Sequence, residues 1–203
     1  IWKKSATSFD TMSNISKKTI QILKTNFYFN KTKIKEIYFS KDGTIKFLFC
    51  FFDNKICEGV LIPHRTRFTA CVSSQIGCSL DCKFCATGKM KIERNLKYQE
   101  IYDQVYLINK KCQQEFSKPI TNIVYMGMGE PFLNYQNVIK SIHKITSPKY
   151  GLGISQKRIT VSTSGISKMI KRFADENIKV NLALSLHSVN DKKRSKIMTI
   201  NDT

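Results

Sequence analysis

The hydrophobic pattern of the first third of the chain changes from a helical period to a strand period. In residues 8–29 apolar side chains recur at helical spacing, and Ser8 and Ser13 are candidate N-caps, so we expect a helix there. Three β-prone segments follow, separated by turn-forming residues and ended by Pro63: residues 34–39, 45–52 and 56–62. These elements predict a small α+β accessory region over residues 1–63.

From residue 64 onward, strand-like and helix-like segments alternate. Each short β-branched segment is followed by a stretch of helical spacing, and this βα repeat predicts a parallel sheet, open or closed into a barrel. The expected strands are residues 66–72, 121–126, 158–162 and 179–185, and the expected helices are residues 97–113, 135–146 and 166–176. The predicted fold class is therefore α/β, with the first four βα units of a barrel in residues 64–203.

Polar and glycine-bearing motifs follow the predicted strands. Gly127-Met-Gly-Glu-Pro131, Thr163-Ser-Gly165 and Ser185-Leu-His187 all fall at carboxyl ends of strands, the edge where βα sheets bind ligands. Ordinary structural roles remain open at each position. Glu130 and Pro131 could start a helix, the serines could be helix caps, and His187 alone is more typical of a hydrogen-bonding residue than of a metal ligand.

Three cysteines in one short loop carry the most specific chemistry. Cys78, Cys82 and Cys85 have the spacing C-x3-C-x2-C, and three thiolates this close can hold a soft metal or a cluster. A [4Fe–4S] cluster needs four ligands, so such a site would keep an open coordination position. A structural zinc loop with a distant fourth ligand is the alternative. No second cysteine pair supports zinc, and the histidines are scattered singly at positions 64, 143 and 187.

The net charge and the cysteine content indicate the kind of partner and the cellular compartment of the protein. The net charge of +19, from 34 Lys and Arg against 15 Asp and Glu, favours a nucleic-acid partner. AT-rich coding sequence could also raise the lysine content, because the basic residues are spread along the whole chain. Seven cysteines without a signal peptide point to a reducing cytoplasm, and no apolar stretch approaches the ~18 residues of a membrane span.

Together the motifs resemble the radical S-adenosylmethionine superfamily and, within it, the RlmN/Cfr family of RNA methyltransferases. The resemblance lies in Cys71–Gly88, Arg94–Leu96, Met126–Pro131, Arg158–Gly165 and Leu182–His187. It implies a partial radical SAM barrel and methylation of adenosine C2 in 23S rRNA, at the peptidyl transferase centre, and at adenosine 37 of tRNA. The alternatives are methylation of adenosine C8, as in the Cfr branch, or a non-catalytic zinc and RNA-binding module.

The resemblance also implies roles for individual residues. Cys78, Cys82 and Cys85 would ligate a [4Fe–4S] cluster, and Cys71 would be a second reactive cysteine that forms a transient disulfide. Glu58 matches the position of a proton acceptor. The residues that match binding positions for S-adenosylmethionine are Gly129, Glu130, Ser162, Ser185, Leu186 and His187. The implied partners are 23S rRNA, tRNA and an electron donor such as a flavodoxin, with a monomeric, cytoplasmic enzyme and no membrane.

Both ends of the sequence look like cuts through a longer protein, since the chain starts at Ile1 and ends at Thr203. The family forms a methyl-cysteine intermediate on a cysteine near its C-terminus, beyond the last matching motif. We therefore predict that these 203 residues cannot complete methyl transfer alone. Mass spectrometry of RNA digests checks this, and 2-methyladenosine produced by the 203-residue chain would contradict it.

Overall fold

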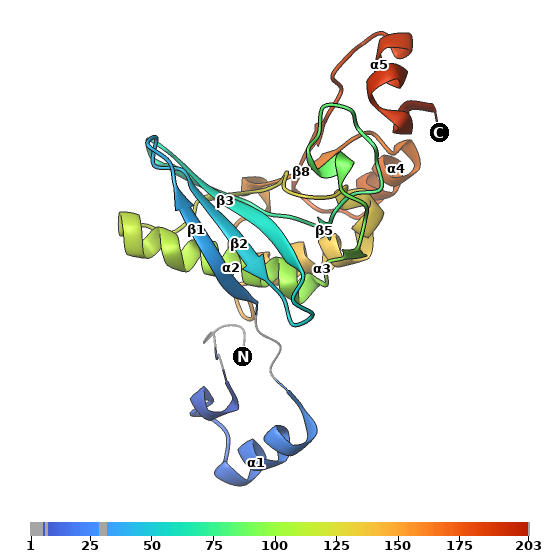
Figure 1. The fold of residues 1–203 in the computed structure, drawn as a ribbon. Helices are drawn as coiled ribbons and strands as arrows, with labels where there is room; N and C mark the ends of the chain where they lie inside the picture. The colour runs from blue at the N-terminus through green and yellow to red at the C-terminus, as the bar shows by residue number, and fades with distance from the viewer. Residues whose placement is uncertain (1–5, 7, 29–31, 203) are drawn as a thin grey trace.

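The computed structural model describes residues 6, 8–28 and 32–202, and all statements below concern these residues. Its centre is one seven-stranded sheet in the order β1-β2-β3-β4-β7-β8-β9 (Figure 1). The strands are β1 Lys33–Phe39, β2 Ile45–Cys50, β3 Ile56–His64, β4 Arg67–Cys71, β7 Asn122–Tyr125, β8 Ile159–Thr163 and β9 Asn181–Leu184. A separate pair, β5 Gln75–Ile76 and β6 Arg94–Asn95, is antiparallel.

The sheet combines an antiparallel and a parallel half. β1 to β4 pair antiparallel as consecutive hairpins, whereas β4, β7, β8 and β9 are parallel. The parallel half confirms the βα repeat, because helices α2, α3 and α4 connect its strands. These helices are α2 Tyr98–Phe116, α3 Tyr135–Thr146 and α4 Ser167–Asp175, and a shorter helix, α5 Asp191–Ile197, follows β9.

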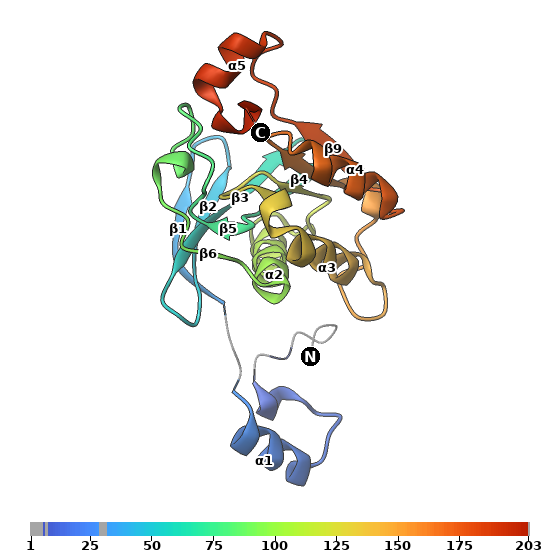
Figure 2. The ribbon, with the colours of Figure 1, turned by 90° about the vertical axis from the view of Figure 1, so that its right-hand side faces the viewer.

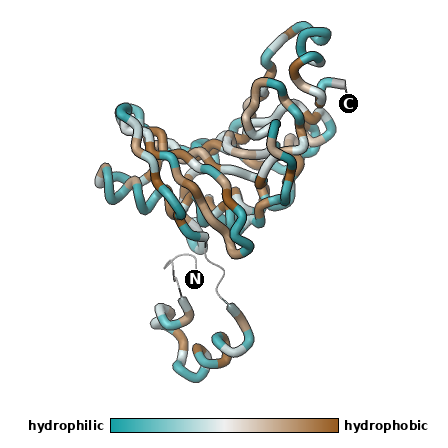
Figure 3. Tube along the Cα trace, viewed as in Figure 1, coloured by the Kyte–Doolittle hydropathy of each residue, from teal (hydrophilic) through white to brown (hydrophobic). Residues whose placement is uncertain are grey.

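Alternation along the strands gives the sheet one apolar and one more open face. In β2, Ile45, Phe47 and Phe49 are buried while the residues between them are partly exposed. The buried face packs against α2, since a Cβ added to Gly59 of β3 would lie 3.4 Å from Ile108 Cδ1. Figure 2 shows α2, α3 and α4 gathered beside the sheet, and Figure 3 shows hydrophobic residues running along its strands. The hydrophobic core therefore lies between the sheet and these helices.

The helix expected over residues 8–29 is divided in the structure. Phe9–Thr11 forms a single 3-10 turn, and α1 spans only Lys17–Asn26. Ser16 caps α1 by accepting a hydrogen bond from the Thr19 amide at 3.1 Å, so the prediction of a Ser13 cap was wrong. Serine and asparagine between the two pieces favour caps and turns over a continuous helix. Figure 1 draws α1 apart from the sheet, and residue 29 lies outside the described residues.

The strand expected to end before Pro63 continues through it to His64. The last residue of β3 that pairs with β2 is Leu61, and Pro63 pairs only with Phe68 of β4. One side of Pro63 is thus an unpaired strand edge, where proline is tolerated because no partner needs its missing N–H. The strand expected over residues 45–52 is in turn shorter, since β2 ends at Cys50.

The predicted division between residues 63 and 64 falls inside one continuous sheet. Val60 of β3 pairs with Cys71 of β4, so the meander is hydrogen-bonded directly to the first parallel strand. The accessory and core regions stay a proposal about sequence organisation. In the structure, the antiparallel strands form one edge of the parallel sheet.

The two outer strands of the sheet differ in their edges. β1 carries Lys33 and Lys35 and has an irregular register between Ile34 and Glu36. β9 pairs with β8 on one side, and its Leu182 and Leu184 are 41% and 51% exposed. Lysines and irregular pairing protect a sheet edge, and β1 has both of these features.

We predict that Phe47→Ala lowers the free energy of unfolding by about 3–5 kcal/mol, because it leaves a cavity in the core. The Phe47 ring is fully buried and stacks on Phe49 at a centroid distance of 5.6 Å. The matched control is Phe39→Ala in β1, whose ring is 62% exposed. We expect less than about 1 kcal/mol for this control. Urea unfolding followed by circular dichroism measures both, and equal losses would contradict this account of the core.

Candidate active site at the carboxyl edge of the sheet

Three of the predicted site residues, Glu58, Cys71 and Ser162, lie on the open face of the sheet. Val60, Cys71 and Val124 are paired across β3, β4 and β7, and paired residues share a face. Glu58 lies two positions from Val60, so it shares the face of Cys71. In β8, Ser162 lies two positions after Thr160, the partner of Val124. Its Oγ is 3.2 Å from Ser185 Oγ, so the structure brings these two serines together.

The cysteine loop leaves and re-enters the fold through the β5–β6 pair. Gln75 pairs with Asn95 and Ile76 with Arg94, and Gln75 Nε2 donates to Asn95 Oδ1 at 2.7 Å. Gly77 follows with a φ of +74°, and a Cβ there would lie 2.1 Å from Lys91 O. The chain can therefore close the base of the loop only with glycine at this position.

Arg94 fixes this base to two other elements. Its guanidinium donates to both carboxylate oxygens of Asp53 in the β2–β3 turn and to both of Glu100 in α2. The bond from Nη1 to Glu100 Oε2 is 2.8 Å, and the same oxygen accepts the Lys97 amide at the start of α2. The hydrogen-bonded Arg94 guanidinium holds the pKa of Asp53 below its usual value. The loop is thus held at its base by a bidentate charge network.

The three loop cysteines are free thiols at the rim of the sheet. The Cys85 amide donates to Cys82 O at 3.0 Å, so these two residues share one tight turn. Burial raises the pKa of Cys78 and Cys82, and the negative charges of the other loop thiolates and of Glu130 raise it further. Glu130 is joined to the base of the loop, because its amide donates to Gln75 Oε1 at 2.8 Å. A bound cation would reverse the rise in these pKa values, because metal binding favours thiolates.

The donor chemistry fits an iron–sulfur cluster, although the thiols do not converge. Three soft sulfur donors share one short loop, and the buried Ser164 Oγ at the end of β8 has no hydrogen-bond partner among the described residues. Within the same residues, no three His, Cys, Asp or Glu side chains gather closely enough to hold a metal ion. The thiols would have to turn toward a common point before they could share a cluster.

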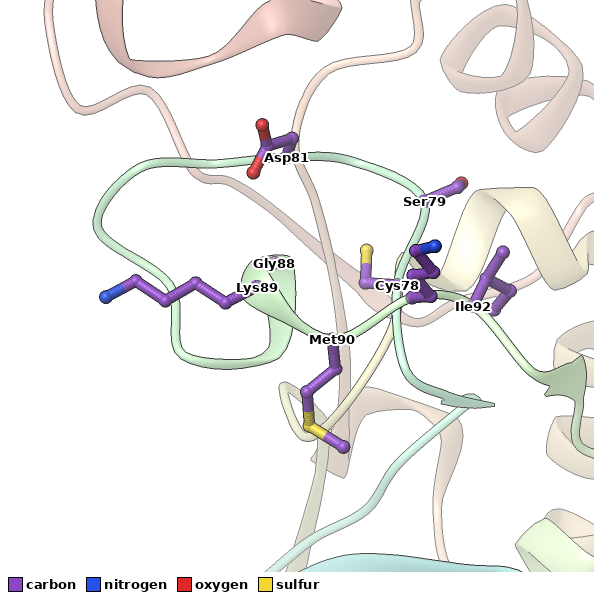
Figure 4. Close-up of a pocket in the computed structure, with 8 residues that line it drawn as sticks. Cys78, Ser79, Asp81, Gly88, Lys89, Met90 and Ile92 are labelled. Carbon is purple, nitrogen blue, oxygen red and sulfur yellow. The ribbon is translucent and has the colours of Figure 1, made fainter.

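A cavity of about 500 Å³ opens inside the cysteine loop. Figure 4 shows Cys78 and Ser79 on one side of it and Gly88, Lys89 and Met90 on the other. Of the three loop cysteines, only Cys78 is among its lining residues. The two arms of the loop meet at this cavity, since the Cys78 amide donates to Met90 O at 3.4 Å, and the cavity forms no cage around the thiols of the described residues.

Glu130 links the ends of three strands. It is 4% exposed, its Oε1 accepts the Phe132 amide at 3.1 Å, and its Oε2 accepts the Ser164 amide at 2.8 Å. Its own amide donates to Gln75 Oε1 at 2.8 Å. The expected helix-initiating turn is present, since Glu130 caps a 3-10 turn at Pro131–Asn134. Its predicted contact with a cofactor stays a prediction beside this structural role.

Gly129 has a φ of +93°, and a Cβ at this position would lie 2.4 Å from Gln75 Cβ. Only glycine allows the segment after β7 to approach the segment after β4 so closely. The same packing brings Ser73 into contact, because the Met128 amide donates to Ser73 Oγ at 2.8 Å. The predicted cofactor position Gly129 is therefore also a close-packing position.

The segment after β9 contacts the cysteine loop. His187 has a φ of +57°, and its ring centroid is 3.9 Å from that of Phe84, the residue before Cys85. The Lys83 amide donates to Ile197 O of α5 at 3.0 Å. Leu186 lies between Ser185 and His187 and is 41% exposed. The structure thus places His187, the last residue of the Ser185–His187 motif, next to the cysteine loop.

Glu58 and Cys71 are less closely tied to the cysteine loop than the residues described above. The Glu58 carboxylate forms an ion pair with Lys46 at 3.0 Å, and both side chains are nearly half exposed. Burial raises the pKa of Cys71 to about 11, so its thiol is largely protonated at neutral pH. All seven cysteines are free, and the transient disulfide of Cys71 stays a prediction.

Sequence reasoning did not single out Ser73, Gln75, Ser164 or Arg194 as site residues. Ser73, Gln75 and Ser164 lie inside the motifs quoted above, so their proximity to the site could have been inferred from the motifs. Arg194 gave no such signal, because it follows Asp191-Lys-Lys193 in a segment that resembles an exposed basic helix. Its burial, at 8% exposure, is visible only in the structure.

None of the helices in the described part of the chain is long and apolar enough to cross a membrane.

Known proteins match this chain closely. The radical SAM superfamily model matches residues 72–203. A probable dual-specificity RNA methyltransferase RlmN from Cytophaga hutchinsonii is 56% identical over 203 residues, all of this chain and 55% of the relative. A relative with the same name from Streptococcus agalactiae is 43% identical over 99% of this chain and 55% of its own length. The chain thus spans about half the length of these curated relatives.

A solved structure agrees with these relatives. The crystal structure of a radical SAM methyltransferase from Sphaerobacter thermophilus matches with a TM-score of 0.91 at 38% identity, over 99% of this chain and 59% of that one. The family model covers well over half of this chain, and it begins one residue after Cys71, at the end of β4. The chain therefore belongs to the radical SAM superfamily.

Proposed function

We propose that this chain is the central part of an RNA methyltransferase that uses S-adenosylmethionine and a [4Fe–4S] cluster to methylate C2 of adenosine in 23S rRNA and tRNA. One observation carries the proposal: the three-cysteine loop lies against the carboxyl ends of the parallel strands. Phe84 in the loop contacts His187 after β9, and Gln75 at the base of the loop accepts the Glu130 amide from the segment after β7. The relatives named above support the reaction class.

The residues divide into cluster ligands and cofactor ligands. Cys78, Cys82 and Cys85 would hold the cluster through three irons and leave the fourth iron for the cofactor. When bound, the cluster and S-adenosylmethionine would supply the reductive radical chemistry that the unreactive C2 carbon of adenine requires. Ser162 and Ser185 present adjacent hydroxyls to hydrogen-bond the cofactor, and Gly129 allows close approach of backbone.

Two residues on the open face, Cys71 and Glu58, would act on the RNA substrate. Cys71 would react with the substrate, and burial keeps its thiol protonated until then. Glu58 would accept a proton, and Lys46 keeps its carboxylate oriented from the neighbouring strand. The target adenine has to be unstacked to reach these groups, as in other enzymes that act on bases. The net charge of +19 supports binding to the RNA backbone.

We further propose a monomeric, cytoplasmic protein that receives electrons from a donor such as a flavodoxin. Free thiols at all seven cysteines are compatible with a reducing compartment.

The cluster can be tested on this chain directly. Anaerobic reconstitution with iron and sulfide should give a brown protein with about four irons per chain, the content of one cubane cluster. Cys82→Ser should abolish the colour, because it removes one of three ligands. Cys50→Ser is the matched control, since Cys50 is the last residue of β2 and lies outside the loop, and this variant should bind iron normally. Stoichiometric zinc without colour would refute the cluster and favour the zinc-binding alternative.

The methylation site can be tested with protein from the complete coding sequence that contains these 203 residues. Mass spectrometry of 23S rRNA and tRNA digests should detect 2-methyladenosine, and Cys71→Ala should remove it while the iron content is kept. Detection of 8-methyladenosine instead would contradict the C2 assignment. Absence of any methylated adenosine from an iron-loaded protein would contradict the proposed function.

A further inference from the structure

Arg194 of α5 is a buried cation that binds the ends of two strands. Its side chain is 8% exposed, and its Nε donates to Leu186 O, after β9, at 3.2 Å. Its Nη2 donates to Ser164 O, after β8, and its Nη1 donates to Asn201 Oδ1. One planar guanidinium therefore joins three segments of the chain.

The partners of this arginine are unusual for a buried charge. Arg94, the partly buried arginine described above, is neutralised by Asp53 and Glu100. Arg194 takes part in none of the ion pairs of the described residues, and its bonds go to two carbonyls and an amide. Burying a cation without a carboxylate costs free energy unless its donors are satisfied. Here oxygens of Leu186, Asn201 and Ser164 satisfy these donors, so the guanidinium is held in one orientation.

The peptide groups that Arg194 binds belong to the candidate site. Leu186 O lies between the predicted cofactor residues Ser185 and His187. Ser164 is held from both sides, since its amide donates to Glu130 Oε2 at 2.8 Å while its carbonyl accepts from Arg194. The Ser164 Oγ itself is buried and has no hydrogen-bond partner among the described residues. Arg194 thus acts on the strand ends from the side opposite to Glu130.

The backbone leaves room for the guanidinium at one glycine. Gly165 has a φ of +109°, and a Cβ there would lie 3.2 Å from Arg194 Nη2 and 3.1 Å from Leu184 Cδ1. A side chain at position 165 would be strained in this conformation and would crowd the arginine. The turn after β8 is therefore shaped to admit Arg194.

We propose that Arg194 is a positioning residue that fixes the ends of β8 and β9 at the spacing needed to bind S-adenosylmethionine. For the role of S-adenosylmethionine, the proposal rests on the function proposed above. The other part, that Arg194 fixes the ends of β8 and β9, concerns the protein alone. A lysine at position 194 would keep the charge, but its single ammonium cannot reproduce the planar fork that reaches both carbonyls.

Two measurements on the full chain test the proposal. Hydrogen exchange without ligand should show faster exchange in residues 162–166 and 184–188 for Arg194→Met than for the wild type. Titration calorimetry of the iron-reconstituted protein with S-adenosylmethionine should show about tenfold weaker binding, the loss expected when hydrogen bonds to a charged group are removed. The number of binding sites should stay unchanged, and Arg194→Lys should recover only part of the affinity.

The matched control is Lys193→Met, which removes an exposed charge from the neighbouring position of the same helix. It should change neither exchange in the two segments nor affinity. Unchanged exchange in Arg194→Met would overturn the proposal, as would fewer binding sites at an unchanged dissociation constant, which indicates partial unfolding. If the wild type binds no S-adenosylmethionine, the proposed function and the cofactor half of this proposal fail together. The exchange data then decide separately whether Arg194 holds the strand ends.

Discussion

The candidate site depends on one buried carboxylate. Glu130 accepts the amides of Phe132 and Ser164 and donates its own amide to Gln75, so it joins the segments after β4, β7 and β8. A carboxylate at 4% exposure is stable only when its oxygens are hydrogen-bonded, and here backbone amides supply both bonds. The three strand ends are therefore held at fixed separations by bonds that the carboxylate itself requires.

The cysteine loop is attached to this framework at its two extremes. Arg94 fixes the base of the loop to α2 and to the β2–β3 turn, whereas Phe84 and Lys83 at the far side contact His187 and Ile197. Between these attachments the Cys78 thiol has a hydrogen bond with the Glu130 backbone, after β7. Rotation of the cysteine side chains can reorient the thiols without moving the sheet. This explains how a donor set with the right chemistry can be present without a converged metal site.

Local sequence patterns predicted most of the parallel half, because its signals are local. The structure has α3 at residues 135–146, as the apolar spacing predicted, and strands β4, β7, β8 and β9 lie within two residues of the expected ranges. The pairing of Val60 with Cys71, which merges the meander into the sheet, is a long-range fact that no local period encodes. The burial of Arg194 could not be predicted for a similar reason, since its partners Leu186 and Ser164 lie 8 and 30 residues away in the sequence.

The unequal edges of the sheet bear on how this polypeptide behaves at high concentration. β1 carries lysines and an interrupted register, features that discourage a second chain from adding to it. β9 has neither, and it presents exposed Leu182 and Leu184 beside backbone groups that pair only with β8 among the described strands. Such a strand is a template for intermolecular β-pairing. In a polypeptide of these 203 residues, β9 is thus the edge at which a second chain would pair, and Leu184→Lys would discourage that pairing.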